Sequence, residues 1–159
     1  MSVNQEAVRN IFSKSLERVF TNQLFAIVAF SAITIIAAQV SIPANPVPFT
    51  LQTLAVVLAG AFLGAKNGAI SQLLYIFIGA VGFPVFANGM GGLPILFGPT
   101  GGYLIAFPLG ALIVGAIVEK YKSYFMVVTA MFLGNLSIIL LGTFYLDAFF
   151  IKDLSASLT

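Results

Sequence analysis

Long apolar runs without a single charged residue dominate this sequence. They cover residues 24–40, 51–65, 69–87, 103–118 and 124–145. A helix needs about 20 mainly apolar residues to cross a membrane core of roughly 30 Å. Only 8% of the side chains are charged, far below the roughly 25% that is typical of a soluble domain. The sequence therefore predicts an all-α integral membrane protein, a polytopic helical bundle with five spans in the lipid bilayer.

The basic residues indicate how the spans are oriented. Six of the seven fall in segments that share one side of the membrane if the spans alternate: Arg9, Lys14, Arg18, Lys66, Lys120 and Lys122. The opposite loops, 41–50 and 88–102, carry no charge of either sign. Because Lys and Arg are enriched in cytoplasmic loops, we predict a multi-pass protein of the plasma membrane. Its N-terminus is predicted to be cytoplasmic, and the two uncharged loops are predicted to face outward.

The first 23 residues follow a different pattern. Apolar side chains recur there at spacings of three and four residues, with charged residues between them: Val8, Ile11, Phe12, Leu16, Val19 and Phe20. This pattern is typical of an amphipathic helix lying in the membrane interface, and no cleavage site of a signal peptide follows it. We therefore divide the chain into an interfacial helix at 1–23, a transmembrane domain at 24–146 and a short external tail at 147–159.

The residue types that are missing exclude several kinds of chemistry. The chain has no His and no Cys, so zinc sites, haem ligation and nucleophilic catalysis that depend on them are excluded. No charged residue lies inside a predicted span, which argues against a proton relay or an ion pump. The basic residues are scattered at loop ends, so we expect no nucleic-acid partner. We expect no enzymatic activity, metal or cofactor, and a ligand held by neutral hydrogen bonds and aromatic walls.

Gln52 lies at the predicted outer entrance of the second span, two residues after Thr50. Two interpretations are open. Thr50 can cap the helix with Gln52 in its first turn, or the Gln52 amide can point into an outward cavity, where it donates and accepts hydrogen bonds at once.

Other polar and small residues in the spans favour helix packing. Gln72 and Tyr75 are three residues apart and share one helix face, where hydrogen bonding between helices is the default role. For Asn135, a hydrogen bond to a neighbouring helix is favoured over ligand contact. Small residues four apart allow close packing within one bundle or between subunits: Gly60, Gly64 and Gly68, then Ala106 and Gly110, then Ala111 and Gly115.

The segment 83–102 is rich in glycine and aromatic residues and carries no charge. A plain external linker would be polar and charged, so we favour a folded, ligand-facing segment. Glycines let backbone amides approach a ligand closely, and Phe83, Phe86 and Phe97 can supply an apolar wall.

Four ordered segments resemble the BioY family, the biotin-binding membrane subunits (S-components) of energy-coupling factor (ECF) transporters. They are Pro48-x-Thr50-x-Gln52-Thr53-Leu54-Ala55-Val56, Gly60 to Gly64, Tyr75-x-x-x-Gly79-Ala80-Val81-Gly82-x-Pro84-Val85-Phe86-Ala87, and Gly98-Pro99-Thr100-Gly101-Gly102-Tyr103-Leu104-Ile105. The resemblance implies an S-component fold, a six-helix bundle that binds biotin near its outer face. It also implies partners, namely a membrane coupling subunit and two cytoplasmic ATPases, with a homo-oligomer as the alternative.

The resemblance carries the ligand site onto particular residues of this chain. The segments that form the family's pocket contain Asn88, Gly91, Gly92 and Tyr103, and we carry over Gln52 as well. We expect Asn88 and the glycine amides to bind the ureido group of biotin, with Phe86 and Tyr103 against the fused rings.

One departure from the family concerns the end of the chain. The family has a sixth helix that carries an Asp and a Lys near its outer end, and no sixth hydrophobic run follows residue 145 here. Three interpretations therefore stand: a subunit that captures biotin from the outer face and delivers it with the coupling module, a truncated and transport-inactive relative, or an S-component for another vitamin.

Overall fold

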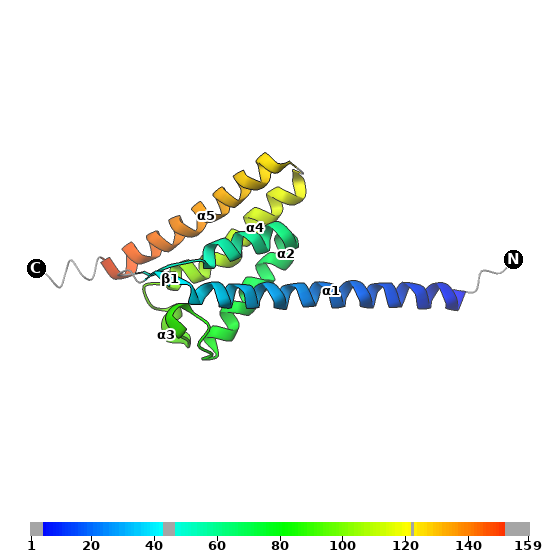
Figure 1. The fold of residues 1–159 in the computed structure, drawn as a ribbon, viewed down its shortest axis with the longest axis horizontal. Coiled ribbons are helices and arrows are strands. Elements are labelled where there is room, and N and C mark those ends of the chain that lie inside the picture. The colour runs from blue at the N-terminus through cyan, green and yellow to red at the C-terminus, as the bar shows by residue number, and fades with distance from the viewer. Residues whose placement is uncertain (1–4, 43–46, 122, 152–159) are drawn as a thin grey trace, which may run out of the picture.

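The computed structural model describes residues 5–42, 47–121 and 123–151, and this part of the chain is almost entirely helical (Figure 1). Its long helices are α1 (Gln5–Gln39), α2 (Gln52–Ala80), α4 (Gly101–Lys120) and α5 (Tyr124–Leu146). Its short elements are β1 (Ser41–Ile42), β2 (Phe49–Thr50), η1 (Ala87–Gly89), α3 (Leu93–Leu96) and the π-helix η2 (Asp147–Ile151). The four long helices of the described part are each apolar and long enough to cross a membrane.

Helix α2 folds back on itself at Gly64, which has φ 79° and ψ −180°. A Cβ built on Gly68 would lie 2.9 Å from the Cα of Gly60, although residues eight apart in a straight helix are separated by about 12 Å. We call residues 52–63 the first arm and residues 65–80 the second arm (Figure 1). The second and third predicted spans are therefore the two arms of α2, joined at Gly64.

The second arm ends earlier than predicted. Helix α2 stops at Ala80 and not near residue 87. Gly82 has φ 114°, a conformation that helices do not continue through, and Pro84 follows, which lacks the N–H that a helix interior needs. The chain from Phe83 onward is therefore free to fold across the end of the bundle.

Small residues bring α2, α4 and α5 into close contact, as their spacing predicts. A Cβ on Gly60 would lie 2.3 Å from the Ala111 carbonyl oxygen, and one on Gly115 would lie 2.1 Å from the Ala65 nitrogen. On the other side of α4, a Cβ on Gly134 would lie 2.3 Å from Val114 Cγ2. Helix α4 thus lies between α2 and α5 (Figure 1), and the predicted packing within one bundle is confirmed.

Helix α1 packs on α2 and runs without a break from Gln5 to Gln39. The predicted N-terminal helix, so far as residues 5–23 show it, is continuous with the first span and projects beyond the bundle (Figure 1). Its location in the membrane interface stays a prediction, and residues 1–4 lie outside the described residues. At the other end, η2 extends α5 into the predicted tail, of which residues 152–159 lie outside the described residues.

The outward faces of the bundle are apolar. On α5, Phe125, Phe132 and Phe144 are each at least 66% exposed. Contiguous exposed apolar surface of this kind marks contact with lipid or with another protein. The inner core contains the aromatic residues Tyr75, Phe86 and Phe107, which come from α2, the segment after it and α4.

Candidate functional site

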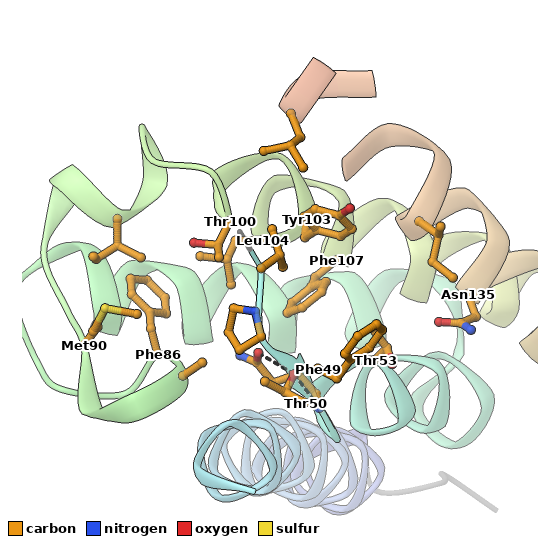
Figure 2. A pocket seen from close by; sticks show the side chains of 17 residues that line it. Phe49, Thr50, Thr53, Phe86, Met90, Thr100, Tyr103, Leu104, Phe107 and Asn135 are labelled. Atoms are coloured by element: carbon orange, nitrogen blue, oxygen red, sulfur yellow. Dashed lines mark hydrogen bonds between the residues drawn. The ribbon is translucent and has the colours of Figure 1, made fainter. Parts of the chain in front are cut away.

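A cavity of about 580 Å³ lies at the end of the bundle that carries β1, β2, η1 and α3, which we call the loop end. Its aromatic wall comprises Phe49, Phe86, Tyr103 and Phe107, and its polar residues are Thr50, Gln52, Thr53, Thr100 and Asn135. In the view of Figure 2, Phe86 and Met90 lie on one side of the cavity and Asn135 lies on the other. The size falls within the range of small-molecule sites, which are mostly apolar with a few placed polar groups.

Gln52 both starts α2 and lines the cavity. The N-cap of α2 is Leu51, so the prediction that Thr50 caps the helix is wrong, whereas Gln52 does lie in the first turn. Its backbone N–H donates to Thr50 Oγ1 at 3.3 Å, and the Thr50 hydroxyl donates to Gln52 Oε1 at 2.8 Å. Its side-chain nitrogen donates to the hydroxyl of Tyr75, which in turn donates to the Val85 carbonyl oxygen at 3.3 Å. This chain of hydrogen bonds ties both arms of α2 to the segment after α2, so the amide is held in one orientation.

Phe86 forms a fully buried part of the aromatic wall, with 1% of its surface exposed. Its ring packs edge-on against Tyr75, with 5.6 Å between the ring centroids and an interplanar angle of 83°. Gln39, at the end of α1, donates from Nε2 to the Phe86 carbonyl oxygen at 3.2 Å. Phe86 is therefore fixed through both its ring and its backbone.

Tyr103 lies near the start of α4 and lines the cavity, as the sequence predicts. Its hydroxyl is 3.2 Å from Thr143 Oγ1 on α5. A Cβ on Gly142 would lie 2.3 Å from Tyr103 Cδ1, so the ring occupies the space over that glycine. This contact holds the aromatic wall against α5.

Asn88, Gly91 and Gly92 are not among the residues that line the cavity. Asn88 has φ 58°, and its Oδ1 accepts a hydrogen bond from the Ser41 hydroxyl at 2.9 Å. A Cβ on Gly91 would lie 2.2 Å from the Phe83 carbonyl oxygen, and Gly92 has φ 95°. Local backbone geometry therefore explains both glycines, and the ligand role of these three residues stays a prediction.

Asn135 is the polar lining residue whose position the sequence did not indicate. Its Oδ1 is buried and has no hydrogen-bond partner in the described part of the chain, so this oxygen does not make the hydrogen bond to a neighbouring helix that was predicted for Asn135. Gln72 does behave as predicted, because its Nε2 donates to Thr34 Oγ1 on α1 at 3.3 Å. Nothing in the local sequence distinguishes these two amides, since both lie in apolar helices.

The described residues that line the cavity carry no charge. Nor do the described residues include a group of three or more His, Cys, Asp or Glu side chains that could hold a metal ion. The arrangement offers hydrogen-bonding amides and hydroxyls beside aromatic rings, which suits a compact ligand that has both polar and apolar faces.

Comparison with known proteins shows which family this sequence matches. The profile of the BioY family matches residues 6–159. The biotin transporter BioY of Thermotoga maritima is 41% identical over 137 residues, which cover 86% of this chain and 80% of that protein. A probable biotin transporter BioY of Lysinibacillus sphaericus is 47% identical over 108 residues, 68% of this chain and 55% of that protein.

Two further similarities concern length and fold. A probable biotin transporter BioY of Pyrococcus horikoshii is 51% identical over 86 residues, 54% of this chain and 53% of that protein. The matches thus span about half the length of the Lysinibacillus and Pyrococcus proteins. The crystal structure of an S-component for biotin from an ECF-type ABC transporter superposes with a TM-score of 0.75 at 26% identity, covering 94% of this chain and 77% of that one.

Proposed function

The chain belongs to the BioY family, and we propose that it is the substrate-binding membrane subunit of a biotin uptake system. The observation that carries this proposal is the cavity at the loop end, with an uncharged lining of aromatic rings and neutral hydrogen-bonding groups. Biotin combines a fused ring system, a ureido group that donates and accepts hydrogen bonds, and a carboxylate chain. Such a ligand needs aromatic surface and oriented amides together.

Three of the cavity residues are proposed to contact biotin directly. Phe86 and Tyr103 offer ring faces to the fused rings of the ligand. Gln52 keeps one side-chain N–H and one lone pair of its oxygen for the ligand, because Tyr75 accepts from the other N–H and Thr50 donates to the other lone pair. Asn88, Gly91 and Gly92 remain proposed contacts, since they lie in the segment after α2 at the loop end.

The proposed transport direction follows from the charge pattern. Lys66 lies just beyond the turn of α2 and Lys120 ends α4, at the end of the bundle opposite the loop end (Figure 1). If this basic end is cytoplasmic, then the N-terminus is cytoplasmic and the cavity opens to the outside of the plasma membrane. The chain contains no phosphate-binding motif, so we propose that a coupling subunit and two cytoplasmic ATPases supply the energy.

Equilibrium binding of biotin to the purified protein in detergent or nanodiscs tests the proposal. We expect saturable binding that unlabelled biotin competes away, and weaker binding by Phe86→Ala and Tyr103→Ala. Tyr124→Phe serves as a control, because Tyr124 is 95% exposed and far from the cavity lining. Absence of biotin binding to a folded protein, or tighter binding of a different vitamin, would contradict the proposal. For Asn88, an Asn88→Ala variant with unchanged affinity would remove that residue from the site.

A further inference from the structure

Two polar side chains at the end of α1 and just after it hold the segment that follows α2. Gln39 donates from Nε2 to the Phe86 carbonyl oxygen at 3.2 Å, and the Ser41 hydroxyl donates to Asn88 Oδ1 at 2.9 Å. Phe86 lines the cavity, whereas Gln39 and Ser41 are not among its lining residues. Resting on the function proposed above, we infer that Gln39 is a positioning residue. Without touching the ligand, it holds Phe86 in the cavity wall and so slows dissociation of the ligand.

Segment 83–92 turns back on itself, so its backbone depends on ties to the helices. The Phe86 N–H donates to the Met90 carbonyl oxygen at 2.8 Å, which closes a turn inside the segment. Around this turn, the hydrogen bonds from helix side chains to the backbone come from Gln39 and Tyr75 in the described part of the chain. Gln39 is the one that bonds to the carbonyl group of Phe86 itself, the residue whose ring forms the cavity wall.

Gln39 differs from Tyr75 in its exposure. Tyr75 is fully buried and packs against the rings of Phe86 and Phe107, so it also supports the core. Gln39 is exposed, so its replacement leaves the core packing in place. Loss of one hydrogen bond of typical net strength changes an equilibrium by a factor of roughly 2 to 12. Loss of the Gln39 amide is therefore expected to populate conformers in which Phe86 has left the wall, without unfolding the bundle.

Gln39 also has a partner on its own helix. Its Nε2 lies 3.5 Å from the carbonyl oxygens of Ile35 and Val85, and the distance to the Phe86 oxygen is the shortest of the three. An amide nitrogen carries two N–H groups, so it can bond to its own helix and to the segment at once. A role limited to the end of α1 would leave ligand dissociation unchanged, and this difference can be measured.

Dissociation of labelled biotin from the purified protein in nanodiscs tests the inference. Gln39→Leu is expected to speed dissociation about fivefold. Gln39→Arg, which keeps N–H donors on a long side chain, is expected to stay within about twofold of the wild type. Gln23→Leu, the same change at another exposed position of α1, is the matched control and is expected to have no effect. Wild-type dissociation from folded Gln39→Leu, or equal acceleration by Gln39→Leu and Gln39→Arg, would overturn the inference.

A double-mutant cycle shows whether Gln39 acts through Phe86. In the Phe86→Ala background, adding Gln39→Leu is expected to change biotin affinity by less than about twofold, because the ring that Gln39 positions is gone. The full effect of Gln39→Leu in that background would overturn the inference, since Gln39 would then act independently of Phe86.

A measurement without ligand tests the inference separately from the proposed function. The chain contains no cysteine, so Ala87→Cys places a single thiol beside Phe86, at a position that is 7% exposed. Adding Gln39→Leu is expected to speed maleimide labelling of this thiol about fivefold, and an unchanged rate would overturn the inference. If labelling becomes faster but the wild-type protein binds no biotin, the proposed function fails and the positioning of the segment by Gln39 stands.

Discussion

The ring of Phe86 occupies the space that a side chain at Gly79 would need. A Cβ built on Gly79 would lie 2.1 Å from Phe86 Cζ, closer than any two such atoms can approach. The Gly92 N–H donates to the Gly79 carbonyl oxygen at 2.7 Å, so the same residue also anchors the segment that carries Phe86. The aromatic wall of the cavity thus depends on a glycine near the end of the second arm of α2.

Gly79→Ala is predicted to displace Phe86 and weaken biotin binding by about tenfold, equivalent to about 1.4 kcal/mol. The matched control is Gly98→Ala, where the nearest atoms to an added Cβ lie 3.4 Å away, at an ordinary contact distance. Isothermal titration calorimetry on both variants makes the comparison. Equal affinities for the two variants would show that the position of Phe86 does not govern binding.

Tyr75→Phe is predicted to destabilise the bundle and to weaken ligand binding together. The substitution keeps the ring contacts with Phe86 and Phe107 but removes the acceptor of the Gln52 side-chain nitrogen. It also leaves the Val85 carbonyl oxygen with only the 3.5 Å hydrogen bond from Gln39 Nε2. We expect a loss of roughly 1–3 kcal/mol in the free energy of unfolding. Thermal unfolding followed by circular dichroism measures it, with Tyr124→Phe as the control at an exposed position. Equal Tm values for the two variants would contradict the prediction.

Gly115→Ala is predicted to separate α2 from α4 and to lower stability by roughly 1–3 kcal/mol, as overpacking does. The added methyl group would lie 2.1 Å from the Ala65 nitrogen and 2.3 Å from the Gly64 carbonyl carbon, and backbone atoms there cannot rotate away. Ala116→Leu, on the exposed face of the same helix, adds more volume and is predicted to have little effect. Folded yield after size-exclusion chromatography ranks the variants, and the opposite ranking would refute the prediction.

Glu119→Ala is predicted to weaken the turn of α2. The Ala65 N–H donates to Glu119 Oε1 at 2.9 Å, so this carboxylate from α4 satisfies a free N–H at the start of the second arm. Loss of such a cap costs about 1 kcal/mol. Glu119→Gln retains an acceptor oxygen and is expected to recover most of the stability in the same thermal unfolding assay. A Gln variant as unstable as the Ala variant would mean that the charge matters and the hydrogen bond does not.

The orientation can be measured by labelling single cysteines, because the chain contains none. Lys66→Cys is predicted to react with an impermeant maleimide only after cells are opened. Phe97→Cys, at a position that is 74% exposed at the loop end, is predicted to react in intact cells. A reversed pattern would place the loop end in the cytoplasm and reverse the proposed direction of capture.

The local sequence predicts the helices better than their connections. Gly60, Gly64 and Gly68 predict close packing, and the structure confirms it, yet their spacing alone does not indicate that Gly64 reverses the direction of α2. The reversal depends on the positive φ of Gly64 and on the contact between the turn and α4. Likewise, the two-residue strands β1 and β2 in the uncharged loop 41–50 have no signal in hydropathy.

The residues of the candidate site also differ in how far the sequence predicted them. Gln52, Phe86 and Tyr103 were predicted from the family pattern and meet in one cavity, whereas Asn88, Gly91 and Gly92 lie outside its lining. Asn135 was predicted to pack against a neighbouring helix, and its place in the cavity lining emerges only when α5 is packed on α4. An amide on an apolar helix has the same local sequence signature in either role.

The sequence by itself determined that this protein is a helical membrane protein of the BioY family. Apolar length, scarcity of charge and ordered motifs are read along the chain, and each apolar run is recognised independently of its neighbours. The tertiary structure decided which side chains share a cavity. Gln52, Phe86, Tyr103 and Asn135 come from four separate segments, and they meet because glycine contacts set how closely α2, α4 and α5 approach. That distance is a property of pairs of helices, so no single stretch of sequence encodes it.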